Sequence, residues 1–268
     1  MLRPRIIPCL LVHNGGLVKT IRFTNSKYVG DPINAVKIFN EKESDELIVV
    51  DIDATVRGAE PNLKVIGHLA AECRMPLCYG GGVRTIEQAK AIVGLGVEKV
   101  AISAAAIGDP SLLTRIAGEI GRQSVVAVLD VKRAPGRDEY EAWTHNGTRN
   151  TGRTVLELAS EMERSGAGEI VVNNIDRDGT MEGYDLDLAA RVRAAVGVPI
   201  TILGGAGSTT HLKQLIQRCG VLGVAAGSLF VFKGPYRAVL INYPGAAQKE
   251  DLLKAARPAG FEPIHENS

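Results

Sequence analysis

The chain alternates between short apolar runs and segments with helical spacing, and this alternation restricts its possible folds more than any other feature. Apolar runs of strand length cover residues 5–12, 46–53, 75–79, 98–103, 124–131, 169–175, 199–203 and 221–226. Segments between them, such as "DPINAVKIFNEKES" and "TVLELASEMERSG", begin with residues that are preferred at a helix N-cap, and several end in Gly. Apolar strands that alternate with helices predict an α/β fold whose parallel sheet is covered on both faces. Eight such units predict a closed (β/α)8 barrel, the TIM barrel, with an open doubly wound sheet as the competing fold.

The two halves of the chain repeat each other. The segment "DELIVVDIDATVRG" (45–58) matches "GEIVVNNIDRDGTM" (168–181), and "PLCYGGGVRT" (76–85) matches "PITILGGAGST" (199–209). The first strand then corresponds to the fifth, so that Leu11 falls on Asp130 and one of two symmetry-related acids is absent. We therefore expect one barrel domain, residues 1–244, built from two duplicated (βα)4 halves at about 1–123 and 124–244.

The composition of the chain argues against several classes of ligand and partner. Apolar residues make up 45% of the chain and charged residues 23%, and the formal net charge of +1 predicts binding to neither nucleic acid nor an anionic membrane. No apolar run reaches the roughly 18 residues that span a bilayer, and the N-terminus lacks a signal-peptide pattern. The 4 cysteines have no paired spacing, which is typical of reduced thiols in a cytoplasmic protein. The 5 histidines are scattered, so the sequence predicts no metal site and no cofactor.

Glycine clusters follow three of the predicted strands, at residues 80–84, 204–208 and 225–228. Glycine at these positions lets the backbone approach a ligand, and helix N-termini supply N–H groups for phosphate. In a barrel this rim carries the active site, and phosphate is often bound after strands 7 and 8. The alternative is that the glycines only form tight turns. Two clusters in symmetric positions favour a ligand with a phosphate at each end. The predicted contacts are Gly81, Gly82, Ser103, Gly204, Gly205, Gly227 and Ser228.

Four charged residues stand at strand starts, where inward positions of a barrel are usually apolar: Arg5, Glu46, Lys99 and Glu169. Two cations and two anions can pair in a ring across the barrel floor, which avoids the cost of unpaired buried charges. The ring is either a gate or a structural salt-bridge layer with no role in transport.

Several motifs point to a known family. The strings "RIIPCL", "GGGVR", "DRDGTMEGYD", "GAGEI" and "GGAG" resemble the cyclase (synthase) subunit of imidazole glycerol phosphate synthase, HisF, to about residue 244. The resemblance implies a (β/α)8 barrel with a bisphosphate site at its rim. It also implies a glutaminase, HisH, docked at the opposite end, which sends ammonia up the barrel. The four charged residues at the strand starts then match the charged gate of that family.

The catalytic positions of that family are only partly kept. Its paired aspartates lie at the ends of strands 1 and 5, and the resemblance carries them to Leu11 and Asp130. Ring closure with C–N cleavage needs protons moved at two places, and leucine can neither donate nor accept a proton. Ser103, Asn173 and Leu203 also replace the family's Asn, Thr and Ser. We therefore expect altered chemistry at this rim and not ordinary cyclase activity.

Three further candidates have two interpretations each. Lys19 matches the family's loop-1 lysine, which closes over ligand, but a solvated lysine in the Gly-rich loop 13–30 is equally compatible. Asp51 ends the second strand pointing inward and either orients ligand or caps the next helix. Asp178 and Gly179 match the family's strand-6 loop, where they hold Lys19 or phosphate, and the same string also forms a good turn.

Longer strings resemble one branch of the family: "VKTIRF", "YVGDPINAVKIFNEKESDEL", "PLCYGGG" and "AAGSLFVFKGPYRAVLINYP". This branch comprises the HisF-like paralogues of acetamidino-sugar pathways, and the resemblance implies two partners. One is a HisH-like glutaminase. The other is an ATP-dependent amidotransferase that turns an acetamido group of a surface-polysaccharide sugar into acetamidino. Three functions stay open: a conduit subunit of such a system, a true cyclase that uses Asp130 with an acid such as Asp51, and a scaffold that only activates a glutaminase.

Two segments lie outside the repeating pattern. The insert 132–153 predicts a hairpin with an Asn146–Gly147 turn, and its Trp143 is interpreted as a packing residue. Residues 245–268 are polar and are expected to form a loosely held tail.

Overall fold

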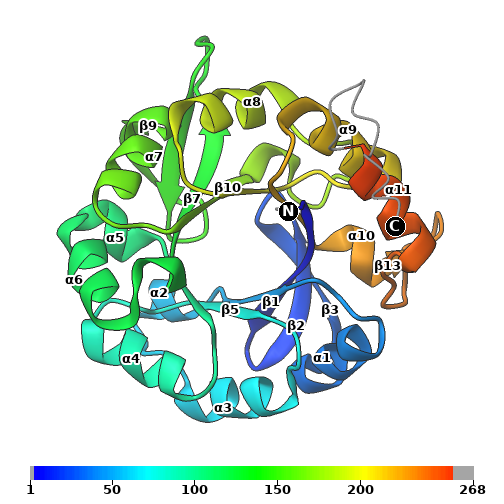
Figure 1. The fold of residues 1–268 in the computed structure, drawn as a ribbon, viewed down its shortest axis with the longest axis horizontal. Helices are drawn as coiled ribbons and strands as arrows, with labels where there is room; N and C mark the ends of the chain where they lie inside the picture. Colours follow the sequence, from blue (N-terminus) through cyan, green and yellow to red (C-terminus); the bar gives the residue numbers. More distant parts are fainter. Residues whose placement is uncertain (1–2, 256–268) are drawn as a thin grey trace, which may run out of the picture.

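Parallel strands close into a barrel, and the helices surround it as an outer ring (Figure 1). The computed structural model describes residues 3–255. The barrel strands in spatial order are β1 (Arg5–His13), β4 (Leu47–Asp51), β5 (Leu77–Gly80), β6 (Lys99–Ile102), β7 (Val125–Arg133), β10 (Glu169–Asn174), β11 (Ile200–Leu203) and β12 (Gly223–Ala226). Strand β12 pairs in parallel with β1, and β10 with β7, so the ring is closed. The predicted (β/α)8 barrel is confirmed, and the competing open sheet is wrong.

The helices begin where the sequence supplies N-cap side chains. Thr85 and Thr154 each form a capping box with the residue three positions later, and the Asp31 carboxylate accepts from the Asn34 backbone N–H at 2.9 Å. The long helices are α1 (Pro32–Glu41), α3 (Leu63–Glu72), α4 (Ile86–Gly94), α6 (Ser111–Ile120), α7 (Val155–Arg164), α8 (Leu186–Ala195), α9 (Thr209–Cys219) and α11 (Ala246–Lys254). Short helical turns are α2 (Ala54–Arg57), α5 (Ala104–Gly108), η1 (Arg122–Ser124), η2 (Ile175–Arg177) and α10 (Ser228–Val231).

A β-hairpin follows the first strand of each half of the chain. Strands β2 (Gly16–Ile21) and β3 (Thr24–Gly30) follow β1, whereas β8 (Tyr140–Thr144) and β9 (Arg149–Thr154) follow β7. The second hairpin turns at Asn146 and Gly147, whose φ angles are 55° and 71°. The first hairpin corrects the expected loop 13–30, because "GLVKTI" and "TNSKYVG" pair as antiparallel strands.

The C-terminal segment differs from the expected loose tail. After the small hairpin of β13 (Phe232–Lys233) and β14 (Ala238–Val239), the chain forms helix α11, whose Leu252 is buried against the core. Lys213 of α9 pairs with Asp251 of α11 at 3.0 Å. The tail prediction is therefore wrong for residues 246–254, and residues 256–268 of the predicted tail lie outside the described residues.

The barrel interior is a small apolar core of its own, separate from the larger core between strands and helices. Its buried members come from successive strands and are Ile7, Cys9, Ile48, Cys78, Ala101, Val126, Val171 and Ala225. Because side chains alternate along a strand, residues two positions before and after these also point inward. The layer before them holds Arg5, Glu46, Lys99 and Glu169, and the layer after them includes Leu11, Ser103 and Asn173.

Candidate functional site: a cavity above a charged floor

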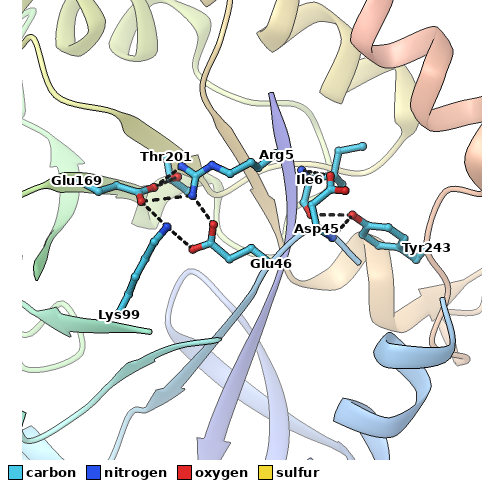
Figure 2. Close-up of polar contacts among 8 residues, drawn as sticks. All are labelled: Arg5, Ile6, Asp45, Glu46, Lys99, Glu169, Thr201 and Tyr243. Carbon is cyan, nitrogen blue, oxygen red and sulfur yellow. Dashed lines mark hydrogen bonds and ion pairs between the residues drawn. The ribbon is translucent and has the colours of Figure 1, made fainter. Parts of the chain in front are cut away.

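Arg5, Glu46, Lys99 and Glu169 meet at the N-terminal end of the barrel, and we call them the floor ring (Figure 2). Arg5 Nη1 pairs with Glu46, and Arg5 Nη2 lies 2.7 Å from Glu169 Oε1. Lys99 Nζ lies 2.8 Å from Glu46 Oε1 and 2.8 Å from Glu169 Oε2. Each cation therefore contacts both anions, as the sequence predicted for this layer.

The two carboxylates of the floor ring are buried, and its two cations are half-buried. Glu46 and Glu169 are only 3% and 5% exposed, so neither carboxylate has water as an adequate partner. Burial by itself would raise the pKa of Glu169, but the charges of Arg5 and Lys99 outweigh it and hold that pKa below its usual value. The fully buried Thr201 hydroxyl donates to Glu169 Oε1 at 2.6 Å. The two cations and two anions of the ring are thus paired with one another.

A cavity of about 370 Å³ occupies the barrel above the floor ring. Its lowest lining residues include Ile48, Ala101 and Val171. Each lies two positions after Glu46, Lys99 or Glu169, so its side chain is the next one inward above that ring residue. The cavity therefore runs from one layer above the ring up to the C-terminal rim, through walls of Cys9, Val50, Cys78, Val128 and Leu203.

Asp130 and Leu11 line the upper part of this cavity. Asp130 lies beside Asn173 on the neighbouring strand, and Asn173 Nδ2 donates to Asp130 Oδ1 at 3.0 Å. Burial raises the pKa of Asp130 to about 7; nearby Asp178 adds to the rise and the Asn173 bond opposes it. Asp130 can thus exchange a proton near neutral pH, whereas Leu11 and Leu203 add only aliphatic surface. Of the two positions that the HisF resemblance predicts to be catalytic, only Asp130 carries a proton-transfer group.

Lys19 reaches into the cavity from hairpin β2–β3 and is 5% exposed. Its ammonium donates to the Cys9 carbonyl, and burial lowers its pKa. The interpretation of Lys19 as a solvated loop residue is therefore wrong. The hairpin is held by Asp178, whose carboxylate accepts from the Thr20 hydroxyl at 2.6 Å.

Asp51 lines the cavity and also caps the helix that follows it. Its Oδ1 accepts from the backbone N–H groups of Asp53 and Ala54, at 2.9 and 3.2 Å. The capping interpretation of Asp51 therefore describes its observed contacts. Next to Asp51, a side-chain hydrogen bond of 2.6 Å joins His13 Nδ1 and Asp53 Oδ1. The sequence did not predict this contact, because neither residue belongs to a recognisable motif.

The glycine-rich loops divide into two groups. Gly81, Gly82, Ser103, Gly227 and Ser228 line the cavity, with Asp178 beside them. Gly179, Gly204 and Gly205 do not line it. These three instead allow close packing of loops, because a Cβ would lie 2.0 Å from Thr20 O at Gly179, 2.6 Å from Asn174 O at Gly204 and 2.1 Å from Gly183 O at Gly205. Loop packing alone accounts for glycine at those three positions.

The described residues offer little support for metal binding, membrane insertion or cysteine chemistry. Across residues 3–255, no cluster of three or more His, Cys, Asp and Glu side chains is placed to hold a metal ion. In the same range, no helix is both long and apolar enough to cross a membrane. All four cysteines are free, and burial raises the pKa of Cys9 in the cavity wall to about 11.

Residues 5–236 match the protein family described as histidine biosynthesis protein. The chain belongs to this family. A relative named "Putative imidazole glycerol phosphate synthase subunit HisF", from Leptospira borgpetersenii, is 54% identical over 94% of this chain and 100% of its own length. A similarly named protein of Pseudomonas aeruginosa, hisF2, is 52% identical over 91% of this chain and 97% of its own. The "Imidazole glycerol phosphate synthase subunit HisF" of Hyphomonas neptunium is 41% identical over 87% of this chain and 91% of its own. The HisF resemblance predicted from the motifs is confirmed.

Proposed function

We propose that this chain is the synthase-type, ammonia-conducting subunit of a glutamine-dependent amidotransferase. A HisH-like glutaminase docks at the floor ring and releases ammonia into the barrel. The ammonia leaves at the rim for an ATP-dependent sugar amidotransferase, which makes an acetamidino group on a surface-polysaccharide sugar. The observation that carries the proposal is a cavity whose lower wall is aliphatic, which begins one layer above a complete floor ring and ends at a rim where Asp130 is present but position 11 is leucine.

The aliphatic lower wall of the cavity favours the passage of neutral ammonia over that of ammonium. Neutral ammonia crosses an aliphatic passage at little cost, whereas an ammonium ion would lose its hydration without gaining a partner. The relatives at 52–54% identity are named as putative HisF subunits, while those at 39–41% carry the HisF name without that word. This division supports a separate branch of the family, which agrees with Leu11 at the cyclase position.

A second part of the proposal concerns the rim. Backbone N–H groups near Gly82, at the start of α5 after Ser103 and at the start of α10 by Gly227 and Ser228 surround the cavity mouth. We propose that they bind the phosphate of a small ligand, with Asp130 and Lys19 next to it. Calorimetry with inorganic phosphate and sulfate is expected to show binding at millimolar concentration. No heat with either anion would contradict this part alone.

Replacing Lys99 with Ala tests the conduit. The change opens the floor ring while Arg5 still neutralises part of the two carboxylates, so glutamine hydrolysis is expected to continue as transfer of its nitrogen falls. Labelled glutamine and ammonium salts, supplied separately to the full system, measure the two routes to product. The Lys90→Ala variant is the control, because Lys90 forms a 2.7 Å ion pair with Glu119 on the outside of the barrel. Equal transfer of glutamine nitrogen by Lys99→Ala and the parent would contradict the proposal.

A further inference from the structure

A polar cleft of about 460 Å³ lies beside the floor ring, at the N-terminal ends of β1, β4 and β5. Three cations line it, Arg3, Arg74 and Lys249, against two acids, Glu43 and Asp45. Arg3 and Arg74 are exposed, and no acid among residues 3–255 forms a salt bridge with either. The cleft therefore carries an excess of positive charge on the face that closes the conduit.

Lys249, on α11, connects this cleft to the barrel strands. Its ammonium lies 2.8 Å from Asp45 Oδ1 and donates to the Glu43 carbonyl at 2.8 Å. The other carboxylate oxygen, Asp45 Oδ2, accepts from the Ile6 backbone N–H at 2.9 Å. One carboxylate thus joins the C-terminal helix to the start of β1.

Tyr243 also holds these two strand starts together (Figure 2). Its hydroxyl accepts from the Asp45 backbone N–H at 3.0 Å and donates to the Ile6 carbonyl at 2.8 Å. Ile6 and Asp45 are the chain neighbours of Arg5 and Glu46, whose side chains form one ion pair of the floor ring. Because a planar peptide unit moves as one piece, a shift of Asp45 against Ile6 also shifts Glu46 against Arg5.

We propose that the cleft receives a carboxylate of the docked glutaminase and that Lys249, Asp45 and Tyr243 relay this docking to the Arg5–Glu46 pair. The inference rests on the proposed function and names the surface and chemistry through which the partner acts. A carboxylate placed between Arg3, Arg74 and Lys249 competes with Asp45 for the Lys249 ammonium. Asp45 is then held only by Ile6 and Tyr243, and the ion pair next to it gains freedom to open. Tyr243 is a positioning residue in this scheme.

Charge reversal in the cleft tests the proposed contact between the cleft and the glutaminase. Binding of the recombinant HisH-like glutaminase of the same organism to the full chain is measured at low and high salt. The Arg74→Glu variant is expected to bind about tenfold more weakly at low salt and with less dependence on salt, since a complementary charge is lost. The control Lys90→Glu makes the same change in net charge on the outer helix α4 and is expected to leave the dissociation constant nearly unchanged. Equal effects of the two variants would overturn the inference while leaving the conduit in place.

Tyr243→Phe tests the relay separately from the contact. Phenylalanine keeps the ring that packs on Phe230 at 5.4 Å between centroids, but it loses both hydroxyl bonds. We expect unchanged glutaminase affinity, unchanged product from ammonium salts and a severalfold loss of product nitrogen from glutamine. Tyr140→Phe is the control, because it removes a hydroxyl bond to Asp185, away from the floor ring. If both variants transfer glutamine nitrogen alike, Tyr243 is only structural and the relay is wrong.

Removal of residues 256–268 distinguishes a second occupant of the cleft. The proposal expects this shortened chain to bind the glutaminase as the full chain does. Markedly tighter binding after the removal would show that the chain's own C-terminal residues fill the cleft, and it would overturn the assignment to the partner. Failure of the unaltered chain to bind the glutaminase would instead overturn the proposed function itself.

Discussion

The floor and the rim of the barrel lie at opposite ends of one cavity. They differ in how many partners their charged side chains have. At the floor, each of two cations contacts both of two buried anions, and a threonine supplies one further hydrogen bond. At the rim, Asp130 and Leu11 line the same cavity, and the Asp130 carboxylate accepts a hydrogen bond from Asn173. A closed set of charges at one end accompanies a reduced set of proton-transfer groups at the other.

This difference bears on whether the barrel conducts ammonia or performs the cyclase reaction. The proposed passage needs an apolar wall above a layer of charges, and the interior cluster and the floor ring of this barrel have that arrangement. Ring closure on a bisphosphate needs acid and base groups at two places, and leucine at position 11 removes one of them. The comparison therefore favours a subunit that delivers ammonia over one that uses it.

The largest expected effect on stability is at the floor. Among residues 3–255, Glu169→Gln leaves Arg5 and Lys99 with Glu46 as their one anionic partner, so we expect a loss of about 3–5 kcal/mol in the free energy of unfolding. Urea unfolding measures it, with Glu161→Gln as the control. Glu161 pairs with Arg153 at 2.6 Å in a more exposed position, so its loss should cost less than about 1 kcal/mol. Similar costs for the two variants would mean that the floor ring is not a tightly coupled layer.

A smaller effect, with a defined pH dependence, is expected at the rim. The pKa of Asp130 is raised in the folded protein to about 7, from an ordinary value of 3.8. Between these values the folded protein binds a proton that the unfolded chain releases, so the free energy of unfolding falls as pH rises through this window. Asp130→Asn removes this loss. The variant is expected to be about 1–3 kcal/mol more stable than the parent at pH 8, and nearly equal to it below pH 4.

Urea unfolding of both proteins at pH 4, 6 and 8 checks this prediction. Asp178, whose pKa burial also raises, is present in both proteins, so most of its contribution cancels in the difference. A gain in stability that does not grow with pH, or a variant less stable than the parent at pH 8, would contradict the assigned environment of Asp130.

The smallest effect concerns the hairpin that covers the rim. Thr20→Val removes the hydroxyl bond to Asp178 and should cost about 1 kcal/mol. Amide hydrogen exchange in β2 and β3 is expected to speed up, because this bond ties the hairpin to the barrel. Thr24→Val is the control, since the Thr24 hydroxyl bonds only to Ile21 O inside the same hairpin. Equal exchange in the two variants would mean that the Thr20 hydroxyl bond does not hold the hairpin.

The sequence predicted the barrel strands and the floor well, because both depend on local alternation. Arg5, Glu46, Lys99 and Glu169 stand out as charges at the start of apolar runs, and their pairing follows from the cost of burying them alone. Thr201 was missed, although its inward position also follows from alternation with Leu203. A lone threonine in a strand carries no signal of a hydrogen bond to a distant carboxylate.

Other features depend on contacts between distant segments. In hairpin β2–β3, strand β3 is polar and exposed and gives no apolar period to detect. Helix α11 is polar except for a few residues, so only its packing on the barrel distinguishes it from a tail. The loop contacts that require glycine at positions 204 and 205 involve Asn174 and Gly183, which no local pattern connects to them.

The central claim is that this barrel conducts ammonia but does not perform ordinary cyclisation. The most direct measurement follows loss of the family's bisphosphate substrate when the full chain is supplied with saturating ammonium at alkaline pH, so that no glutaminase is needed. The account predicts no detectable turnover, and only a trace after Leu11→Asp, since Ser103, Asn173 and Leu203 also differ from the family. Turnover of about 1 s⁻¹ or more by the unaltered chain, on the usual scale of enzymes, would contradict it.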